Sequence, residues 1–143
     1  MLGLTASVYT GDTNFGMENG QTRDVGMSLL IRTDSGALIG NLNNVWLQYA
    51  NNGSGNQDSG VGAGMVWNSD RQMYEGTFHL TQSGIYDYHY VSIKLGDDLN
   101  YLDRADVAPT ITAISTSVPT YISKDGFGNA FSLGSDASFT IRL

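Results

Sequence analysis

The sequence predicts an all-β protein, a sandwich or a barrel, and three observations lead to that class. Apolar and polar residues alternate along several short runs, which is the pattern of a strand with one buried face. Charged residues make up only 15% of the chain, and glycine, serine, threonine, asparagine and aspartate, the residues of turns, take their place. No stretch repeats its apolar residues with the period of a helix.

The expected strands follow one another along the chain and are separated by turn residues. They are residues 4–10, 25–33, 44–50, 73–80, 84–95, 110–115 and 137–143. In the third of them, Val45, Leu47 and Tyr49 alternate with polar positions and should point into the core. Tyr90 breaks the alternation of the fifth, so we expect a β-bulge or a two-sided strand near it, with Tyr90 exposed.

Residues 51–64, NNGSGNQDSGVGAG, form a low-complexity segment in which Val61 is the only bulky side chain. Such a segment can bury almost nothing, so we expect a long connection between two strands. The alternative is a binding loop, because functional residues gather on loops.

A strand-like run, a short corner and a tyrosine follow one another over residues 74–86, and the pattern continues to residue 101. The residues that carry it are Gly84, Tyr86, Val91, Ser92, Ile93, Leu95, Asp97, Asp98, Asn100 and Tyr101. This pattern resembles the immunoglobulin-like repeats of bacterial cell-surface and surface-layer proteins. The resemblance implies an immunoglobulin-like antiparallel β-sandwich over residues 1–118, with Tyr86 as the structural corner whose hydroxyl closes the loop between two strands. It also implies a non-catalytic structural or adhesive module, extracellular or at the cell surface.

The segments that begin at Tyr9 and Tyr121 share an order of residues: each reaches an aspartate, then Phe-Gly, then an apolar run ending in Ile-Arg. The offset of about 110 residues is the size of one immunoglobulin-like module, which favours a tandem repeat. Residues 119–143 would then begin the next repeat, or their strands would complete this sandwich. A strand left without a partner invites self-association through the C-terminal strand.

The net charge is −7 and the chain has only two lysines, Lys94 and Lys124. Without a basic stripe we expect no nucleic acid partner, and without a long apolar run we expect no membrane insertion. The absence of cysteine excludes disulfides and thiolate catalysis. No base can be paired with a nucleophile or metal, so we expect no enzyme and no cofactor. The expected partner is a protein or glycan at the cell surface.

Trp46, Trp67 and Tyr90 form the best candidate binding site. Trp46 lies on the polar side of its run beside Asn44 and Gln48, and Trp67 precedes Asn68. Aromatic rings beside amides are suited to carbohydrate binding, because rings stack on sugar faces and amides bond to hydroxyls. The alternative for Trp46 is the buried tryptophan that immunoglobulin-like sandwiches carry in their core.

Carboxylates gather near the end of the tyrosine-rich run. Asp97, Asp98 and Asp103 are the candidate ligands if calcium is bound, because Ca²⁺ takes oxygen ligands from such side chains. Their spacing does not match an EF-hand loop, and the alternative is an acidic, solvated hairpin.

Overall fold

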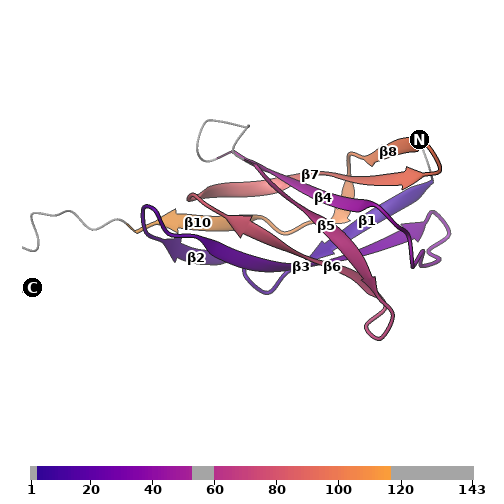
Figure 1. The fold of residues 1–143 in the computed structure, drawn as a ribbon, viewed down its shortest axis with the longest axis horizontal. Helices are drawn as coiled ribbons and strands as arrows, with labels where there is room; N and C mark the ends of the chain where they lie inside the picture. Colours follow the sequence, from indigo (N-terminus) through magenta and orange to yellow (C-terminus); the bar gives the residue numbers. More distant parts are fainter. Residues whose placement is uncertain (1–2, 53–59, 117–143) are drawn as a thin grey trace, which may run out of the picture.

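The computed structural model describes residues 3–52 and 60–116, and its regular structure is entirely β (Figure 1). The strands are β1 (Leu4–Tyr9), β2 (Asn14–Met17), β3 (Arg23–Thr33), β4 (Val45–Asn51), β5 (Val61–Asn68), β6 (Met73–Leu80), β7 (Gly84–Leu95), β8 (Asp98–Leu102), β9 (Ala105–Val107) and β10 (Ile111–Ser115). Neither described range contains a helix long and apolar enough to cross a membrane.

The strands form one curled sheet with the shape of a half-barrel. Their order is β2-β10-β7-β4-β5-β6-β3-β1-β9, and β8 also pairs with β7. β10 pairs with the beginning of β7 and β8 pairs with its end. The sheet has two halves, one with β1, β3, β6 and β9 and the other with β2, β4, β7, β8 and β10. β5 joins them, because residues 61–65 pair with β4 and residues 66–68 pair with β6.

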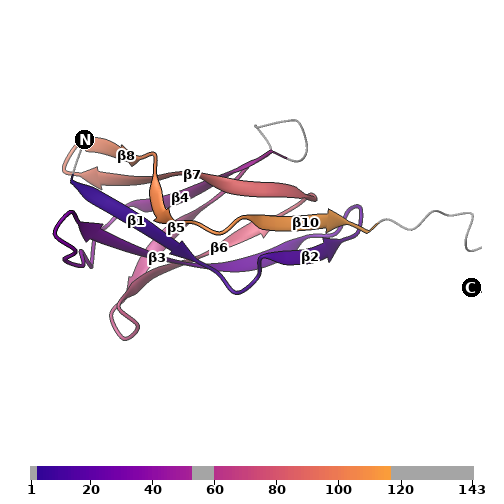
Figure 2. The ribbon, with the colours of Figure 1, turned by 180° about the vertical axis from the view of Figure 1, so that it is seen from behind.

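The sheet is mixed, which corrects the expectation of a purely antiparallel sandwich. β1 pairs with β9 and β2 pairs with β10 in parallel, and the other pairs are antiparallel. The β2–β10 pair arises because the chain crosses between halves after Tyr9: β1 pairs with β3, whereas β2 lies beside β10 in the other half (Figure 2). Residues 119–143, expected as further strands or a next repeat, lie outside the described residues.

The core lies between the inward faces of the two halves. Val45, Leu47 and Tyr49 of β4 are buried, which confirms the alternation predicted for that strand. The Tyr49 ring meets the Phe78 ring of β6 edge to face, with centroids 5.2 Å apart. This contact joins the two halves at the centre of the core.

Most of the strands that the sequence pattern does not predict are short. Apart from the run at residues 137–143, which is not described, the expected strands are present to within a few residues. The assignment of residues 51–64 to a connection is wrong at both ends, because β4 ends at Asn51 and β5 begins at Val61. Val61, Ala63 and Met65 face the core, while Gly62 and Gly64 face outward, so the strand reads as a low-complexity sequence. β2, β8 and β9 were also missed.

Candidate functional site: an aromatic outer face

The outward side of β5, β4, β7 and β8 carries a group of rings. Val91 and Ile93 are buried, so the residues between and beside them in β7 point away from the core. In the register, Trp46 of β4 lies opposite Gly64 on one side and Ser92 on the other. The strand pairing therefore places this tryptophan in the middle of the outward side.

The indole of Trp46 lies across β5 at Gly62. A Cβ added to Gly62 would lie 2.5 Å from Cζ2 of Trp46, and it would also overlap Oε1 of Gln48. Nε1 of Trp46 donates to Oε1 of Gln48 at 2.9 Å, and Nε2 of Gln48 donates to the carbonyl oxygen of Tyr49 at 3.1 Å. The ring is thus oriented by its neighbours, while the residue remains 40% exposed.

A β-bulge brings a second group of rings to the same side. Gln48 pairs with Tyr90 and Tyr49 pairs with Tyr88, so His89 is an extra residue of β7. The His89 and Tyr90 ring centroids are 4.9 Å apart. The bulge confirms the irregularity predicted at Tyr90. Tyr90 itself is half-buried and not exposed as predicted, and the exposed ring that the bulge adds is that of His89.

β8 contributes the last ring. Tyr101 lies opposite Ser92 in the register, and its ring centroid is 5.1 Å from that of Tyr90. Tyr101 is 47% exposed. Ser92 points outward but is only 7% exposed, and it lies opposite Trp46 and Tyr101 in the register. We call Trp46, His89, Tyr90 and Tyr101 the aromatic face.

The tyrosines of this face differ from those of the core in the hydrogen bonding of their hydroxyl groups. The core tyrosines donate to backbone carbonyls: Tyr49 to Pro109, Tyr74 to Ile39, Tyr86 to Gln82 and Tyr88 to Leu102. Burial raises the pKa of each of these four phenols. Within the described part of the chain, the hydroxyls of Tyr90 and Tyr101 have no hydrogen-bond partner. They therefore remain available to a ligand.

The predicted site residues are divided between the two sides of the sheet. Trp46 and Tyr90 lie on the aromatic face, so the alternative that Trp46 is the buried core tryptophan is wrong. Trp67 faces inward, against the Tyr74 ring at 4.9 Å and beside Gly40, and does not join them. Trp67 is in phase with the inward residues Val61, Ala63 and Met65 of β5, so the alternation along this strand predicts that it faces inward.

Tyr101 was not predicted as a site residue. Its exposure follows from the short strand after the turn at Gly96, whose alternation of Leu99 and Tyr101 with Asn100 and Leu102 was not recognised as a strand.

The candidate calcium ligands are not brought together. Asp98 begins β8 and Asp103 follows its last residue, so about 16 Å of extended chain separates them. Among residues 3–52 and 60–116, no three side chains of His, Cys, Asp or Glu gather as a metal site would require. Asp97, Asp98 and Asp103 are exposed along a hairpin, as the alternative interpretation expected.

Tyr86, expected as the structural corner, donates its hydroxyl to the carbonyl oxygen of Gln82 at 2.7 Å. This bond joins β7 to the connection that precedes it. The residue is buried and takes no part in the aromatic face.

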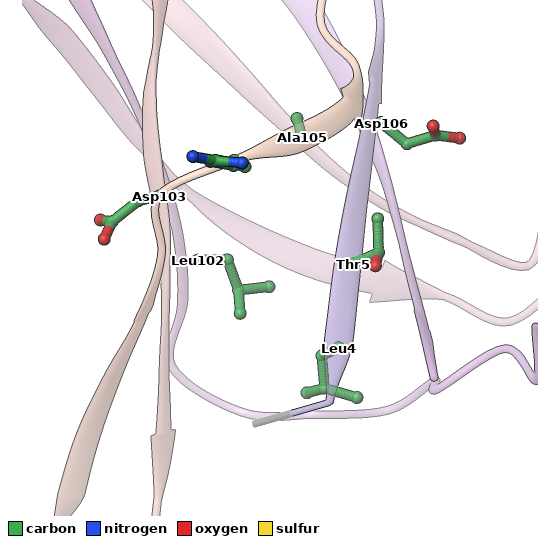
Figure 3. A pocket seen from close by; sticks show the side chains of 7 residues that line it. Leu4, Thr5, Leu102, Asp103, Ala105 and Asp106 are labelled. Atoms are coloured by element: carbon green, nitrogen blue, oxygen red, sulfur yellow. The ribbon is translucent and has the colours of Figure 1, made fainter. Parts of the chain in front are cut away.

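A cavity of about 550 Å³ opens where the beginning of β1 meets the connection from β8 to β9 (Figure 3). It is lined by Leu4, Thr5, Leu102, Asp103, Arg104, Ala105 and Asp106. The carboxylates of Asp103 and Asp106 point away from each other on opposite sides of it (Figure 3). These two carboxylates therefore do not converge on one point, as the polar groups of a specific ligand site would.

Comparison of the chain with family models, with curated proteins and with solved structures finds no match. The resemblance to bacterial immunoglobulin-like repeats therefore stays a prediction, and the function has to be argued from the aromatic face itself.

Proposed function

We propose that the chain is a non-catalytic immunoglobulin-like module of a bacterial cell-surface or secreted protein, and that it is adhesive through its aromatic face. The observation that carries the proposal is a group of rings on the outward side of three adjacent strands: the exposed Trp46 and Tyr101, with the half-buried Tyr90 on the strand between them. Exposed rings gathered on one side of a soluble domain are typical of binding surfaces.

The pairing of the strands supports the immunoglobulin-like part of the proposal. β1, β3 and β6 would correspond to strands A, B and E of that fold, and β4, β7 and β10 to strands C, F and G. The hydrogen bond from Tyr86 to Gln82 has the position of the tyrosine corner between strands E and F. β8 and β9 would then be an insertion between strands F and G, and β8 supplies Tyr101.

A carbohydrate-binding module is the second candidate, and the setting of Trp46 favours it. The indole is oriented by Gln48 and lies over a glycine, which keeps the neighbouring strand clear of side chains. A ring held in this way presents an apolar surface suited to the C–H groups of a sugar.

Binding of the labelled protein to an array of cell-surface glycans and extracellular proteins tests the adhesive function. We expect the wild-type protein to be retained and Trp46→Ala to lose retention. Tyr9→Ala is the matched control, because Tyr9 is also exposed and lies on the other half of the sheet. Equal retention of both variants, or none for the wild type, would contradict the proposal.

A further inference from the structure

We propose that the ligand of the aromatic face is a neutral polysaccharide chain, which lies across the strands from Trp46 to Tyr101. The inference rests on the proposed adhesive function and names the chemical class of its ligand. Three properties of the face support it: the kinds of groups that it exposes, its length across the strands, and the charge of the molecule that surrounds it.

The exposed groups match the two kinds of surface that a sugar presents. The Trp46 ring offers an apolar surface, and its N–H is already bonded to Gln48. The hydroxyls of Tyr90 and Tyr101 have no partner within the described part of the chain and can exchange hydrogen bonds with sugar hydroxyls. A pyranose has C–H groups on its faces and hydroxyls at its edge, so one chain can satisfy both.

The length of the face favours a chain over a single sugar. The backbones of Trp46 and Tyr101 are separated by β7, which places them about 10 Å apart. The Trp46 ring leans still further away, over Gly62 of β5. A single pyranose is too small to touch both ends, whereas consecutive sugars of an extended chain reach from one to the other.

The charge of the molecule selects against an acidic chain. The protein carries 14 acidic and 7 basic residues. On β7, the central strand of the face, the formal charges of Asp87 and Lys94 cancel, so the excess negative charge comes from the rest of the molecule. Repulsion at this net charge disfavours uronic or sulfated polymers, whereas it leaves a neutral chain unaffected.

Electrophoresis in native gels that contain soluble polysaccharides is the first test. We expect a neutral polymer, among a β-glucan, a xylan and a galactomannan, to retard the wild-type protein. Trp46→Ala and Tyr101→Ala should each weaken the affinity about threefold to tenfold, the contribution of one aromatic contact. Tyr9→Ala should migrate as the wild type does, and thermal unfolding of each variant checks that it folds.

Titration with oligosaccharides of increasing length then tests whether a chain is required. Affinity should rise with length until both ends of the face are covered, and monosaccharides should not compete. Equal competition by a monosaccharide would overturn the inference, and so would retardation by polygalacturonate or alginate alone. An array on which Trp46→Ala loses binding to a protein, with no glycan bound, would leave the adhesive function standing and refute the polysaccharide ligand.

Discussion

The two halves of the curled sheet each have an outward side, and the side chains on these two sides differ in kind. On β3 and β6, Ser28 lies opposite Glu75, and Oδ1 of Asp24 lies 2.7 Å from Nδ1 of His79. We call Asp24, Ser28, Glu75 and His79 the polar face. The aromatic face occupies the equivalent side of β4, β7 and β8.

The polar face shows that these strands do not need rings on their outer side. Both halves bury the same kind of inward residues, such as Val25 and Met27 of β3 or Val45 and Leu47 of β4. The exposed rings therefore contribute little that the fold requires, and an exposed apolar patch is better explained by binding. Four predictions test this contrast, from the largest effect to the smallest.

Alkaline pH should destabilise the protein through its core tyrosines and not through its outer faces. Burial raises the folded-state pKa of Tyr49 and Tyr88 above the ordinary tyrosine value of about 10, so these two residues ionise just above that pH only in the unfolded chain. Their contribution is fully present below pH 10 and is lost as the pH rises towards the folded-state pKa. We expect a loss of about 1.4 kcal/mol per pH unit for each such tyrosine. Urea unfolding on either side of pH 10 measures it, and an unchanged slope in Tyr49→Phe would contradict this assignment.

Gly62→Val should disturb the aromatic face, whereas Gly26→Val should leave the polar face intact. The new Cβ at Gly62 would overlap Trp46 and Gln48, and overpacking of this kind costs about 1–3 kcal/mol. A Cβ at Gly26 meets nothing within 4 Å, so its variant should be neutral or more stable by up to about 1 kcal/mol. Urea unfolding and tryptophan emission measure both variants. Equal stability of the two would show that Gly62 does not position the indole.

Tyr86→Phe and Tyr101→Phe remove the same hydroxyl from a core tyrosine and an exposed one. The Tyr86 hydroxyl bonds to the Gln82 carbonyl, so its loss should cost about 1 kcal/mol of unfolding free energy. Tyr101→Phe should change it by less than about 0.5 kcal/mol, because Tyr101 is 47% exposed. Thermal unfolding separates the two. If Tyr101→Phe were the more destabilising change, the aromatic face would be part of the structural core.

Asp24→Ala on the polar face should have the smallest effect. The side chains of Asp24 and His79 are 67% and 61% exposed, and exposed ion pairs contribute about 0–1 kcal/mol. Ligand binding at the aromatic face should be unchanged in this variant. A loss of binding equal to that of Trp46→Ala would mean that the two faces do not act separately.

The sequence was sufficient where the structure depends on local alternation, and insufficient where it depends on pairing between distant strands. The inward positions of Val45, Leu47 and Tyr49 follow from a period of two, and the bulge was visible as a break in that period at Tyr90. Local alternation does not predict which residues lie near Trp46 on the outward side. Tyr101 joins it only because β8 pairs with β7 in one particular register.

Glycine has two structural roles in this chain, and composition does not distinguish them. The glycine-rich sequence around Gly62 predicts a connection, whereas in the structure Gly62 lies on a strand and makes space for the Trp46 indole. Near Gly96, where φ is +63°, it marks a true turn between β7 and β8. Strand pairing is needed to decide whether a glycine lies in a turn or makes space on a strand.

β5 belongs to both halves of the sheet, since its first residues pair with β4 and its last residues pair with β6. Opening either half therefore removes hydrogen bonds from a backbone that the other half also uses, and the two should open as one cooperative unit. A ligand that stabilises β4 and β5 at the aromatic face should then slow the hydrogen exchange of amides in β6, on the far side of the molecule.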